Sequence, residues 1–380
     1  MGSLLNFVWF SHKLEKNGDD NTTIAGPLFW NVDKSEYSHT FNGELREGYK
    51  NLILMEGKCS LQSFSNLDDD LINFIKNNDV KLLAVSLADP SSYSSYIETI
   101  EFLNKTIPNK FIIIDSNTAL PEKYVIDYFL EEASSNDSKS LLFRHKNDLG
   151  YISEDIQISE LNRFRTKKFI SFNRTTDKHH RARLLHEYLT NDYSDSYFSF
   201  LSPLEHLGDI DSVGSIIHLR DFYNKQIPIE LDTMECKNKN GFGTNATFKK
   251  DLFLNSCINL VTETSFDCNQ LFISEKILKP IICYQPFIVF GPYQYLKRLK
   301  TYGYKTFSDV WDESYDDIKD WRERLKVLID LVNGLNSKSI EEINEIYLKT
   351  KNICIYNREL FNSLELDSFP QIFKNIENEW

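Results

Sequence analysis

The sequence predicts an α/β fold with two Rossmann-like domains that face a central cleft. Its length of 380 residues, with 41% hydrophobic residues, allows a large core and favours two domains over one. In both halves, continuous apolar runs of strand length alternate with segments of helical hydrophobic spacing. Such strands are buried on both faces, so they indicate a parallel sheet that is covered by helices on its two sides.

The first half begins with a strand at the apolar run LLNFVWF, close to the amino terminus. Continuous apolar runs predict further strands at residues 80–86 and 110–115. Between these strands, residues 93–107 carry apolar side chains at helical spacing, and residues 121–132 are again helical, with a proline in the first turn. Strands joined by helical crossovers of this length form βαβ units.

The second half repeats this alternation. We expect strands at residues 169–172, 257–261, 287–290 and 305–307. We expect helices at residues 179–189, 274–282, 293–302 and 316–333. A polar, turn-rich stretch precedes this half at residues 134–138. The sequence therefore predicts a first domain at residues 1–160, a second domain at residues 161–345, and C-terminal helices at residues 346–380 that can cross back to the first domain.

Composition excludes several classes of protein. The net charge of -13 argues against a general nucleic-acid coat and against a protein that binds anionic membranes. The six cysteines lack the spacing of metal sites, and Cys257 and Cys283 fall in apolar runs that suit reduced, buried thiols. No apolar stretch is long enough to span a membrane, and the first apolar run lacks the basic start of a signal peptide. We therefore expect a cytoplasmic protein.

A charged pair, Glu275 and Lys276, stands at the start of an expected helix, directly after Ser274, whose hydroxyl can cap a first-turn amide. In a parallel sheet, the loop after a strand and the start of the next helix open at the carboxyl edge, where ligands bind. Free amides and the helix dipole favour an anion there. Lys276 can then bind a diphosphate and Glu275 a sugar hydroxyl. The alternative is a solvated ion pair on a core helix.

A local reversal of charge lies upstream of this pair. Between Arg163 and Arg183 there are eight lysines and arginines and one acidic residue. Asn173 and Arg174 follow the expected strand at residues 169–172, and Arg181 lies in the helix that comes next. Planar guanidinium groups suit phosphate oxygens. A solvated basic helix face is one alternative, and a nucleic-acid contact is another, although net charge and the lack of interleaved aromatic residues disfavour it.

The order of these motifs resembles the donor-binding half of GT-B glycosyltransferases related to the α1,3-fucosyltransferases. The matching residues are Glu263, then Ser274-Glu275-Lys276, and then the apolar run PFIVFG at residues 286–291. The resemblance covers about residues 165–330. Ser274 replaces the family's usual threonine, Pro280 departs from the pattern, and the first half matches only weakly.

The resemblance implies an inverting transferase that moves a sugar, usually fucose from GDP-fucose, to a hydroxyl of a glycan or related acceptor. The first domain would bind the acceptor and the second the nucleotide sugar. Because arginine and lysine stabilise the leaving diphosphate, neither a metal nor a cofactor beyond this co-substrate is implied. The implied donor-binding residues are Asn173, Arg174, Arg181, Arg183, Glu263, Glu275 and Lys276. Either Arg181 or Arg183 can hold the place of the family's arginine.

Two other functions remain open. The same two-lobed scaffold can serve a non-catalytic ligand-binding or interaction protein, because fold alone does not give function. A glycosyltransferase that acts on modified DNA bases is the other alternative, and there the basic segment would contact the acceptor rather than the donor.

A general base is expected at the carboxyl edge of the first domain. The turn LADPSS, which contains Asp89, loosely resembles the family's acidic turn after an N-terminal strand. Asp115, at the end of the next strand, is the runner-up, and His12 is a weaker candidate for an acceptor contact. Asp89 can also simply cap its turn. Asp209 and Asp211 form the DxD pattern of metal-dependent transferases, but such a triplet arises easily by chance in a chain with 56 acidic residues.

Overall fold

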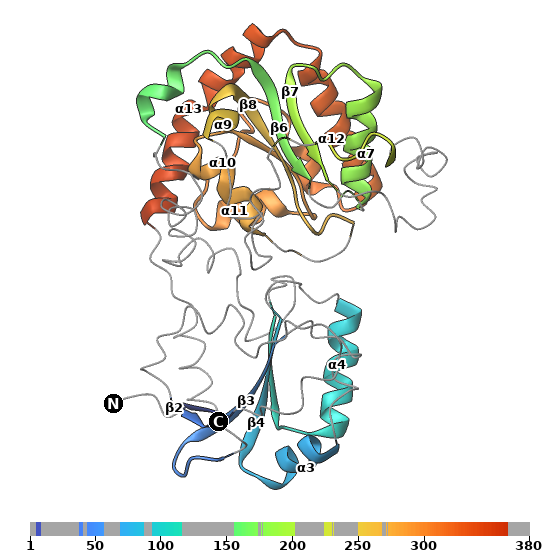
Figure 1. The fold of residues 1–380 in the computed structure, drawn as a ribbon, viewed down its shortest axis with the longest axis vertical. Helices are drawn as coiled ribbons and strands as arrows, with labels where there is room; N and C mark the ends of the chain where they lie inside the picture. Colours follow the sequence, from blue (N-terminus) through green and yellow to red (C-terminus); the bar gives the residue numbers. More distant parts are fainter. Residues whose placement is uncertain are drawn as a thin grey trace. The chain divides into compact units, whose positions relative to one another are not determined.

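The computed structural model describes two compact units, each built around a parallel sheet (Figure 1). The described residues are 5–8, 38–40, 44–56, 69–86, 93–115, 156–173, 176, 178–201, 224–229, 231, 250–267, 271 and 273–363. Those up to residue 115 belong to the first unit, and those from residue 156 onward belong to the second. The domain boundary predicted at residue 160 stays a prediction, because residues 116–155 lie outside the described part of the chain.

The first unit contains a five-stranded parallel sheet in the order β2-β1-β3-β4-β5. Its strands are β1 (Leu5–Val8), β2 (Ser38–Thr40), β3 (Lys50–Glu56), β4 (Val80–Ser86) and β5 (Phe111–Asp115). Helix α3 (Asp69–Asn77) connects β3 to β4, and α4 (Tyr93–Thr106) connects β4 to β5. Apolar residues of both helices and three strands form one core: Ile53, Ile75, Val80, Leu82, Leu103, Ile107 and Ile113.

Three of the strands and one helix of this unit confirm the sequence prediction, namely β1, β4, β5 and α4. The reason is physical: a parallel sheet is covered by other elements, so its strands read as continuous apolar runs. The sequence analysis did not predict β2 or β3. The helix predicted at residues 121–132 lies outside the described residues.

The second unit contains a four-stranded parallel sheet in the order β7-β6-β8-β9. Its strands are β6 (Lys167–Asn173), β7 (Ser196–Phe200), β8 (Ser256–Thr262) and β9 (Phe287–Phe290). Both β8 and β9 are buried along their whole length, which explains their unbroken apolar sequences. Three of these strands confirm predictions, whereas β7 was not predicted.

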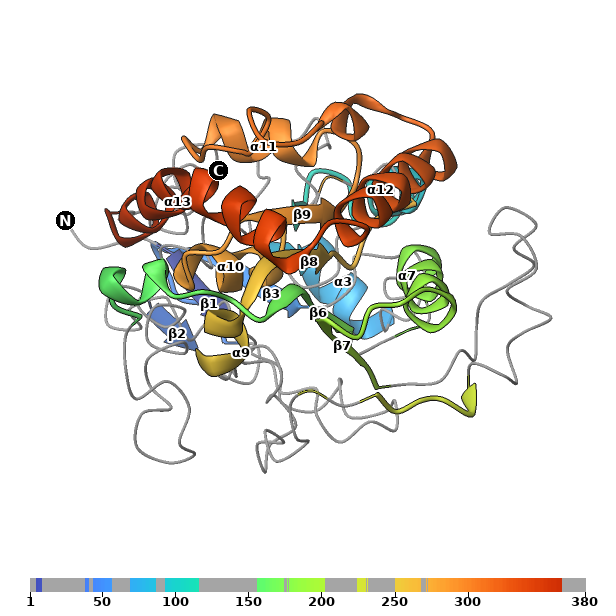
Figure 2. The same ribbon diagram turned by 90° about the horizontal axis from the view of Figure 1, so that it is seen from above.

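Helices cover this sheet on both sides. They are α7 (His179–Thr190), α9 (Lys250–Asn255), α10 (Leu278–Ile282), α11 (Tyr295–Thr301), α12 (Trp321–Asn336) and α13 (Ile340–Ser363), together with the 3-10 turns η1 (Ile158–Asn162), η4 (Glu275–Ile277) and η5 (Ser314–Asp317). Figure 2 shows α7 and α12 side by side, and the Asn333 amide joins them by donating to Glu187 Oε2 at 2.9 Å.

Helix α13 contacts α10, β6 and β8, so residues 346–363 form part of the second unit. Residues 364–380 lie outside the described part of the chain. The predicted return of residues 346–380 to the first domain therefore stays a prediction.

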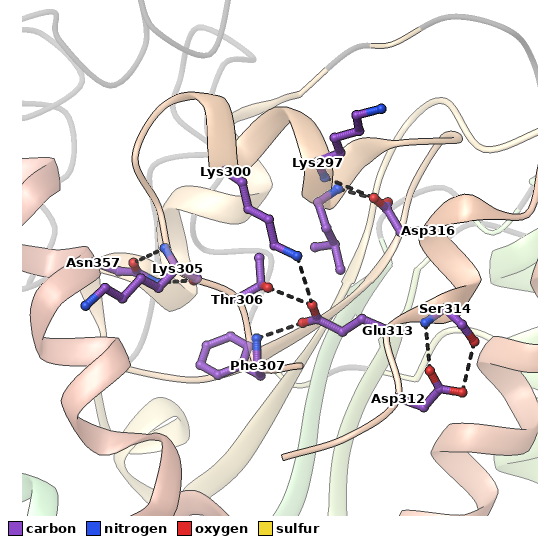
Figure 3. A network of polar contacts seen from close by, with 11 residues as sticks. Lys297, Lys300, Lys305, Thr306, Phe307, Asp312, Glu313, Ser314, Asp316 and Asn357 are labelled. Atoms are coloured by element: carbon purple, nitrogen blue, oxygen red, sulfur yellow. Dashed lines mark hydrogen bonds and ion pairs between the residues drawn. The ribbon is translucent and has the colours of Figure 1, made fainter. Parts of the chain in front are cut away.

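The short strand predicted at residues 305–307 is wrong, because side chains make hydrogen bonds with the backbone groups that a sheet would use. The Lys305 amide donates to Asn357 Oδ1 at 2.9 Å, and the Asn357 amide donates to the Lys305 carbonyl at 2.8 Å. The Phe307 amide donates to Glu313 Oε1 at 2.7 Å, and the Thr306 hydroxyl donates to Oε2 at 2.6 Å (Figure 3). This segment is irregular and joins no sheet.

The long helix predicted from residue 316 begins five residues later, at Trp321. Asp320 caps it, because its carboxylate accepts the amides of Arg322 and Glu323. Asp316 serves another helix: it accepts the Leu296 and Lys297 amides at 2.9 Å each, at the start of α11 (Figure 3). An aspartate ahead of an apolar helix can thus cap a helix that is distant in the sequence.

The described cysteines, Cys257, Cys283 and Cys354, are buried free thiols, as predicted for the first two. Burial raises the pKa of Cys257 and of Cys354 to about 12. Thiols in such surroundings are unreactive at neutral pH. Among the described helices, none has the length and apolar character that a bilayer span requires.

Candidate functional site

The candidate site lies at the carboxyl edge of the second sheet, between β6 and β8. In the order β7-β6-β8-β9, the chain first adds β7 on one side of β6 and then adds β8 on the other side, so the strand order reverses at β6. Open α/β sheets bind ligands at such a switch point, outside the carboxyl ends of the two strands. Asn173 ends β6 and Thr262 ends β8. The topology therefore brings the predicted residues Asn173 and Glu263 to the same edge.

The two strand ends are joined by a buried amide. The Thr262 hydroxyl donates to Asn173 Oδ1 at 2.8 Å, and the Asn173 amide donates to Ser171 Oγ at 3.2 Å. Asn173 is fully buried. Its side chain thus fixes the spacing of β6 and β8 beneath the loops that follow them, while its predicted contact with the donor stays a prediction.

Glu263 follows β8 and carries a buried carboxylate that three donors satisfy. Ser274 donates its hydroxyl to Oε2 at 2.6 Å and its amide to Oε1 at 3.3 Å, and the Tyr295 hydroxyl donates to Oε1 at 2.6 Å. Glu263, Ser274 and Tyr295 are each at most 1% exposed. A carboxylate enclosed in this way holds its neighbours in place, and its predicted role in binding the donor stays a prediction.

Lys276 reaches the same group of residues from the turn η4. Its Nζ donates to Ser274 Oγ at 3.1 Å and to Thr264 Oγ1 at 3.3 Å. Ser274 has one hydroxyl proton, which goes to Glu263, so its oxygen can accept from Lys276. The serine therefore links the buried carboxylate to the ammonium group. Lys276 is half-buried, which leaves part of its side chain facing solvent.

The helix predicted at residues 274–282 is split in the structure. Residues Glu275–Ile277 form the 3-10 turn η4, and Leu278–Ile282 form the short helix α10, which contains Pro280. Ser274 Oγ accepts the Lys276 amide at 3.3 Å, as expected for a cap. The structure describes the backbone of Glu275 but not its side chain.

Arg181 is buried, and it binds the backbone at the end of β8. Its Nη2 donates to the Thr262 carbonyl at 2.9 Å and to the Glu263 carbonyl at 3.1 Å. The residue is 5% exposed. The alternative of a solvated basic face is therefore wrong for Arg181, and it is equally wrong for the fully buried Arg165.

Arg183 points toward a different part of the second unit. Its Nη2 lies 2.6 Å from Glu187 Oε1, and Glu187 also accepts the Asn191 amide at 2.8 Å. Through Glu187 it belongs to the contact between α7 and α12. The structure thus brings Arg181, and not Arg183, to the end of β8.

Two further side chains, those of His180 and Arg324, anchor the loop after β8. His180 stacks on Phe266 with ring centroids 4.8 Å apart, and its Nε2 donates to the Glu263 carbonyl at 2.9 Å. The Arg324 guanidinium lies 4.8 Å from the centroid of the same Phe266 ring and donates to its carbonyl. These contacts attach the loop at residues 263–267 to α7 and α12.

No protein-family model matches the sequence, and no curated protein matches it. Among solved structures, the chain is similar to an α,α-trehalose-phosphate synthase (UDP-forming) from Burkholderia vietnamiensis. The two share 11% sequence identity with a TM-score of 0.34, over 86% of this chain and 68% of that chain. A functional assignment for this chain therefore rests on the residues of its site and not on this likeness.

Arg181, Lys276 and Glu263 make the site favourable to an anion. Two cations and one carboxylate leave one positive charge among these three side chains. The start of α7 adds backbone amides that a helix cannot satisfy internally, and its N-cap residue, Lys178, makes no side-chain capping bond. Together these features suit a phosphate or diphosphate group.

Several predicted residues cannot be placed in this site. Arg174, Asp89, Asp209, Asp211 and His12 lie outside the described residues. Conversely, the sequence analysis missed Tyr295, Thr264 and His180. Only His180 had a local signal, since it belongs to a histidine pair directly after the basic loop.

The buried His180 should make stability depend on pH. Desolvation lowers its pKa well below the ordinary value of 6.5, so the folded protein keeps it neutral. The unfolded chain binds this proton below about pH 6.5, so stability is complete above that pH and falls below it. His180→Gln keeps a donor for the Glu263 carbonyl but cannot titrate. Wild type should lose about 1 kcal/mol per pH unit more than this variant.

Urea unfolding of both proteins at about pH 7.5 and pH 5.5 measures this difference. Identical pH dependence in the two proteins would contradict the assignment of a neutral, buried His180.

Proposed function

We propose that this chain is an inverting glycosyltransferase of GT-B type that uses a nucleotide-diphosphate sugar. In this proposal the donor binds at the carboxyl edge between β6 and β8, and the sugar passes to a hydroxyl of a glycan or related acceptor held by the first unit. The observation that carries the proposal is the position of Lys276, half-buried beside Ser274 and Thr264 at the topological switch point. Ligands of α/β sheets bind at such points.

The proposed chemistry is electrostatic stabilisation of the leaving diphosphate. Lys276 supplies a full charge, and the start of α7 supplies free amides that favour phosphate. Arg181 has a positioning role, because its guanidinium donates hydrogen bonds to the carbonyls of Thr262 and Glu263 and so fixes the end of β8. With this charge supplied by side chains, the reaction needs no metal in our proposal.

The identity of the sugar follows from the resemblance to the α1,3-fucosyltransferases. We propose fucose carried by GDP, with Glu275 binding a hydroxyl of the sugar. A panel of nucleotide sugars in a thermal-shift assay tests this choice, because a ligand that binds the native state raises the midpoint of unfolding.

Lys276→Ala should weaken binding of a nucleoside diphosphate by about 10- to 150-fold. The estimate follows from the loss of one charge-assisted hydrogen bond, worth about 1.5–3 kcal/mol. Isothermal titration calorimetry with GDP and UDP measures the change. The matched control is Lys297→Ala, which removes an exposed lysine at the start of α11 in the same unit and should bind as wild type does.

The titrations are carried out with and without EDTA. Unchanged affinity for both nucleotides in the Lys276→Ala variant would rule out this edge as the donor site. Binding that disappears in EDTA and returns with Mn²⁺ would instead favour the Asp209 and Asp211 pattern.

A further inference from the structure

A second polar cluster flanks the candidate site and contributes none of the donor contacts proposed so far. His179 is the first residue of α7, and its Nδ1 lies 2.6 Å from Asp267 Oδ2. The imidazole ring also stacks on the indole of Trp321, with centroids 4.9 Å apart and an interplanar angle of 7°. The side chains of His179 and Asp267 are 24% and 38% exposed, so solvent and solutes can reach them.

These two contacts fix the imidazole in one orientation. Trp321 covers one face of the imidazole ring. The Arg322 guanidinium packs on Trp321, 4.5 Å from the centroid of the tryptophan ring. Asp267 engages Nδ1, which leaves Nε2 as the nitrogen that can contact a ligand. Because the two nitrogens lie on opposite sides of the ring, the carboxylate is kept away from whatever Nε2 binds.

The loop that carries Asp267 is the same loop that contacts Lys276. Thr264 accepts from Lys276, and Asp267 lies three residues further along the chain. Three residues span at most about 11 Å between their Cα atoms, so Lys276 and His179 contact side chains of one short loop. His180, the neighbour of His179, binds the Glu263 carbonyl at the other end of this loop.

We propose that His179 is a further donor-binding residue, whose Nε2 donates a hydrogen bond to a phosphate oxygen of the nucleoside diphosphate. Asp267 is then a positioning residue, which orients the ring through its contact with Nδ1. The contact with His179 lowers the pKa of Asp267, so the carboxylate is ionised at neutral pH. This inference rests on the proposed function, since it concerns the same ligand.

A purely structural role for the pair makes a different prediction. An ion pair with both partners partly exposed contributes little to stability, typically less than about 1 kcal/mol. If the pair served only the fold, its removal would shift the unfolding midpoint slightly and leave ligand affinity unchanged. A ligand contact predicts the opposite pattern.

The test is calorimetric titration of GDP and UDP into wild type, His179→Gln, Asp267→Asn and the double variant. His179→Gln should weaken binding by about 3- to 10-fold, the range for one net hydrogen bond. Asp267→Asn should weaken it in the same direction, and the double variant should lose no more than His179→Gln alone, because both act through one contact. His186→Gln, the same substitution further along α7, is the matched control and should bind as wild type does.

The outcomes separate this inference from the proposed function. If wild type binds neither nucleotide, both fail. If wild type binds and His179→Gln binds equally well, only the role of His179 is overturned. Losses that simply add in the double variant would also overturn it, because they would show two independent effects. If His179→Gln does not fold, Asp267→Asn still decides the question, because the position is exposed and unchanged nucleotide affinity in that variant would overturn the inference.

Discussion

Arg165→Ala should lower the free energy of unfolding by about 3–5 kcal/mol, because at least two charge-assisted hydrogen bonds and a large buried side chain are lost. Arg165 precedes β6 and is fully buried. Its Nη1 donates to the carbonyls of Ser256, at 2.6 Å, and Phe253, and its Nη2 donates to the Tyr347 hydroxyl. The guanidinium also lies 3.8 Å from the centroid of the Tyr347 ring.

These contacts tie three parts of the second unit together: the segment before β6, the junction of α9 and β8, and helix α13. Asn344 of α13 reinforces the link, since it accepts the Arg165 amide and donates to its carbonyl, each at 2.8 Å. Gln285 donates to the same Ser256 carbonyl at 2.7 Å, so part of this junction survives the substitution. We therefore expect a destabilised unit rather than a different fold.

Urea unfolding followed by circular dichroism measures this effect. The matched control is Arg163→Ala, two residues away, where the arginine is exposed. Surface substitutions of this kind usually change stability by less than about 0.5 kcal/mol. Equal stability losses in the two variants would contradict the role assigned to Arg165.

Asp89→Asn should reduce turnover about 100-fold or more and leave the affinity for the nucleotide sugar nearly intact, as expected for the loss of a general base. Asp89 itself lies outside the described residues, but β4, the strand before it, ends at Ser86 as the sequence predicts. β4 lies between β3 and β5, so its carboxyl end is flanked by a strand on each side. Asp115, by contrast, ends β5, which is the last strand in the order of the described sheet.

The measurement is steady-state transfer from the nucleotide sugar together with calorimetric titration of the same donor. Asp115→Asn is the matched control, because it makes the same substitution at the end of the neighbouring strand. Unchanged turnover in Asp89→Asn with reduced turnover in Asp115→Asn would transfer the role of base to Asp115. A chain that binds the donor but transfers nothing would favour the non-catalytic alternative.

The sequence by itself determined the α/β class and the position of most of the described strands. Residues 287–290 form a strand that is buried along its whole length, and this burial demands a continuous apolar run that can be read locally. The sequence also indicated where a ligand would bind in each domain, because the carboxyl ends of parallel strands are ligand-binding edges whatever the strand order. Lys276 and Asn173 were selected as donor-binding candidates on this basis, and their contact with a donor stays a prediction.

Only the tertiary structure decided what each charged residue does. Arg165, Arg181 and Arg183 belong to one basic segment, yet the first two bind buried carbonyls and the third pairs with Glu187. The partners of Arg165 and Arg181 lie about 80 to 180 positions away in the chain. Tyr295 is likewise 32 positions from Glu263. Local periodicity records which face of an element is buried, but a hydrogen bond between distant segments depends on strand order, and that order is fixed only when the whole sheet packs.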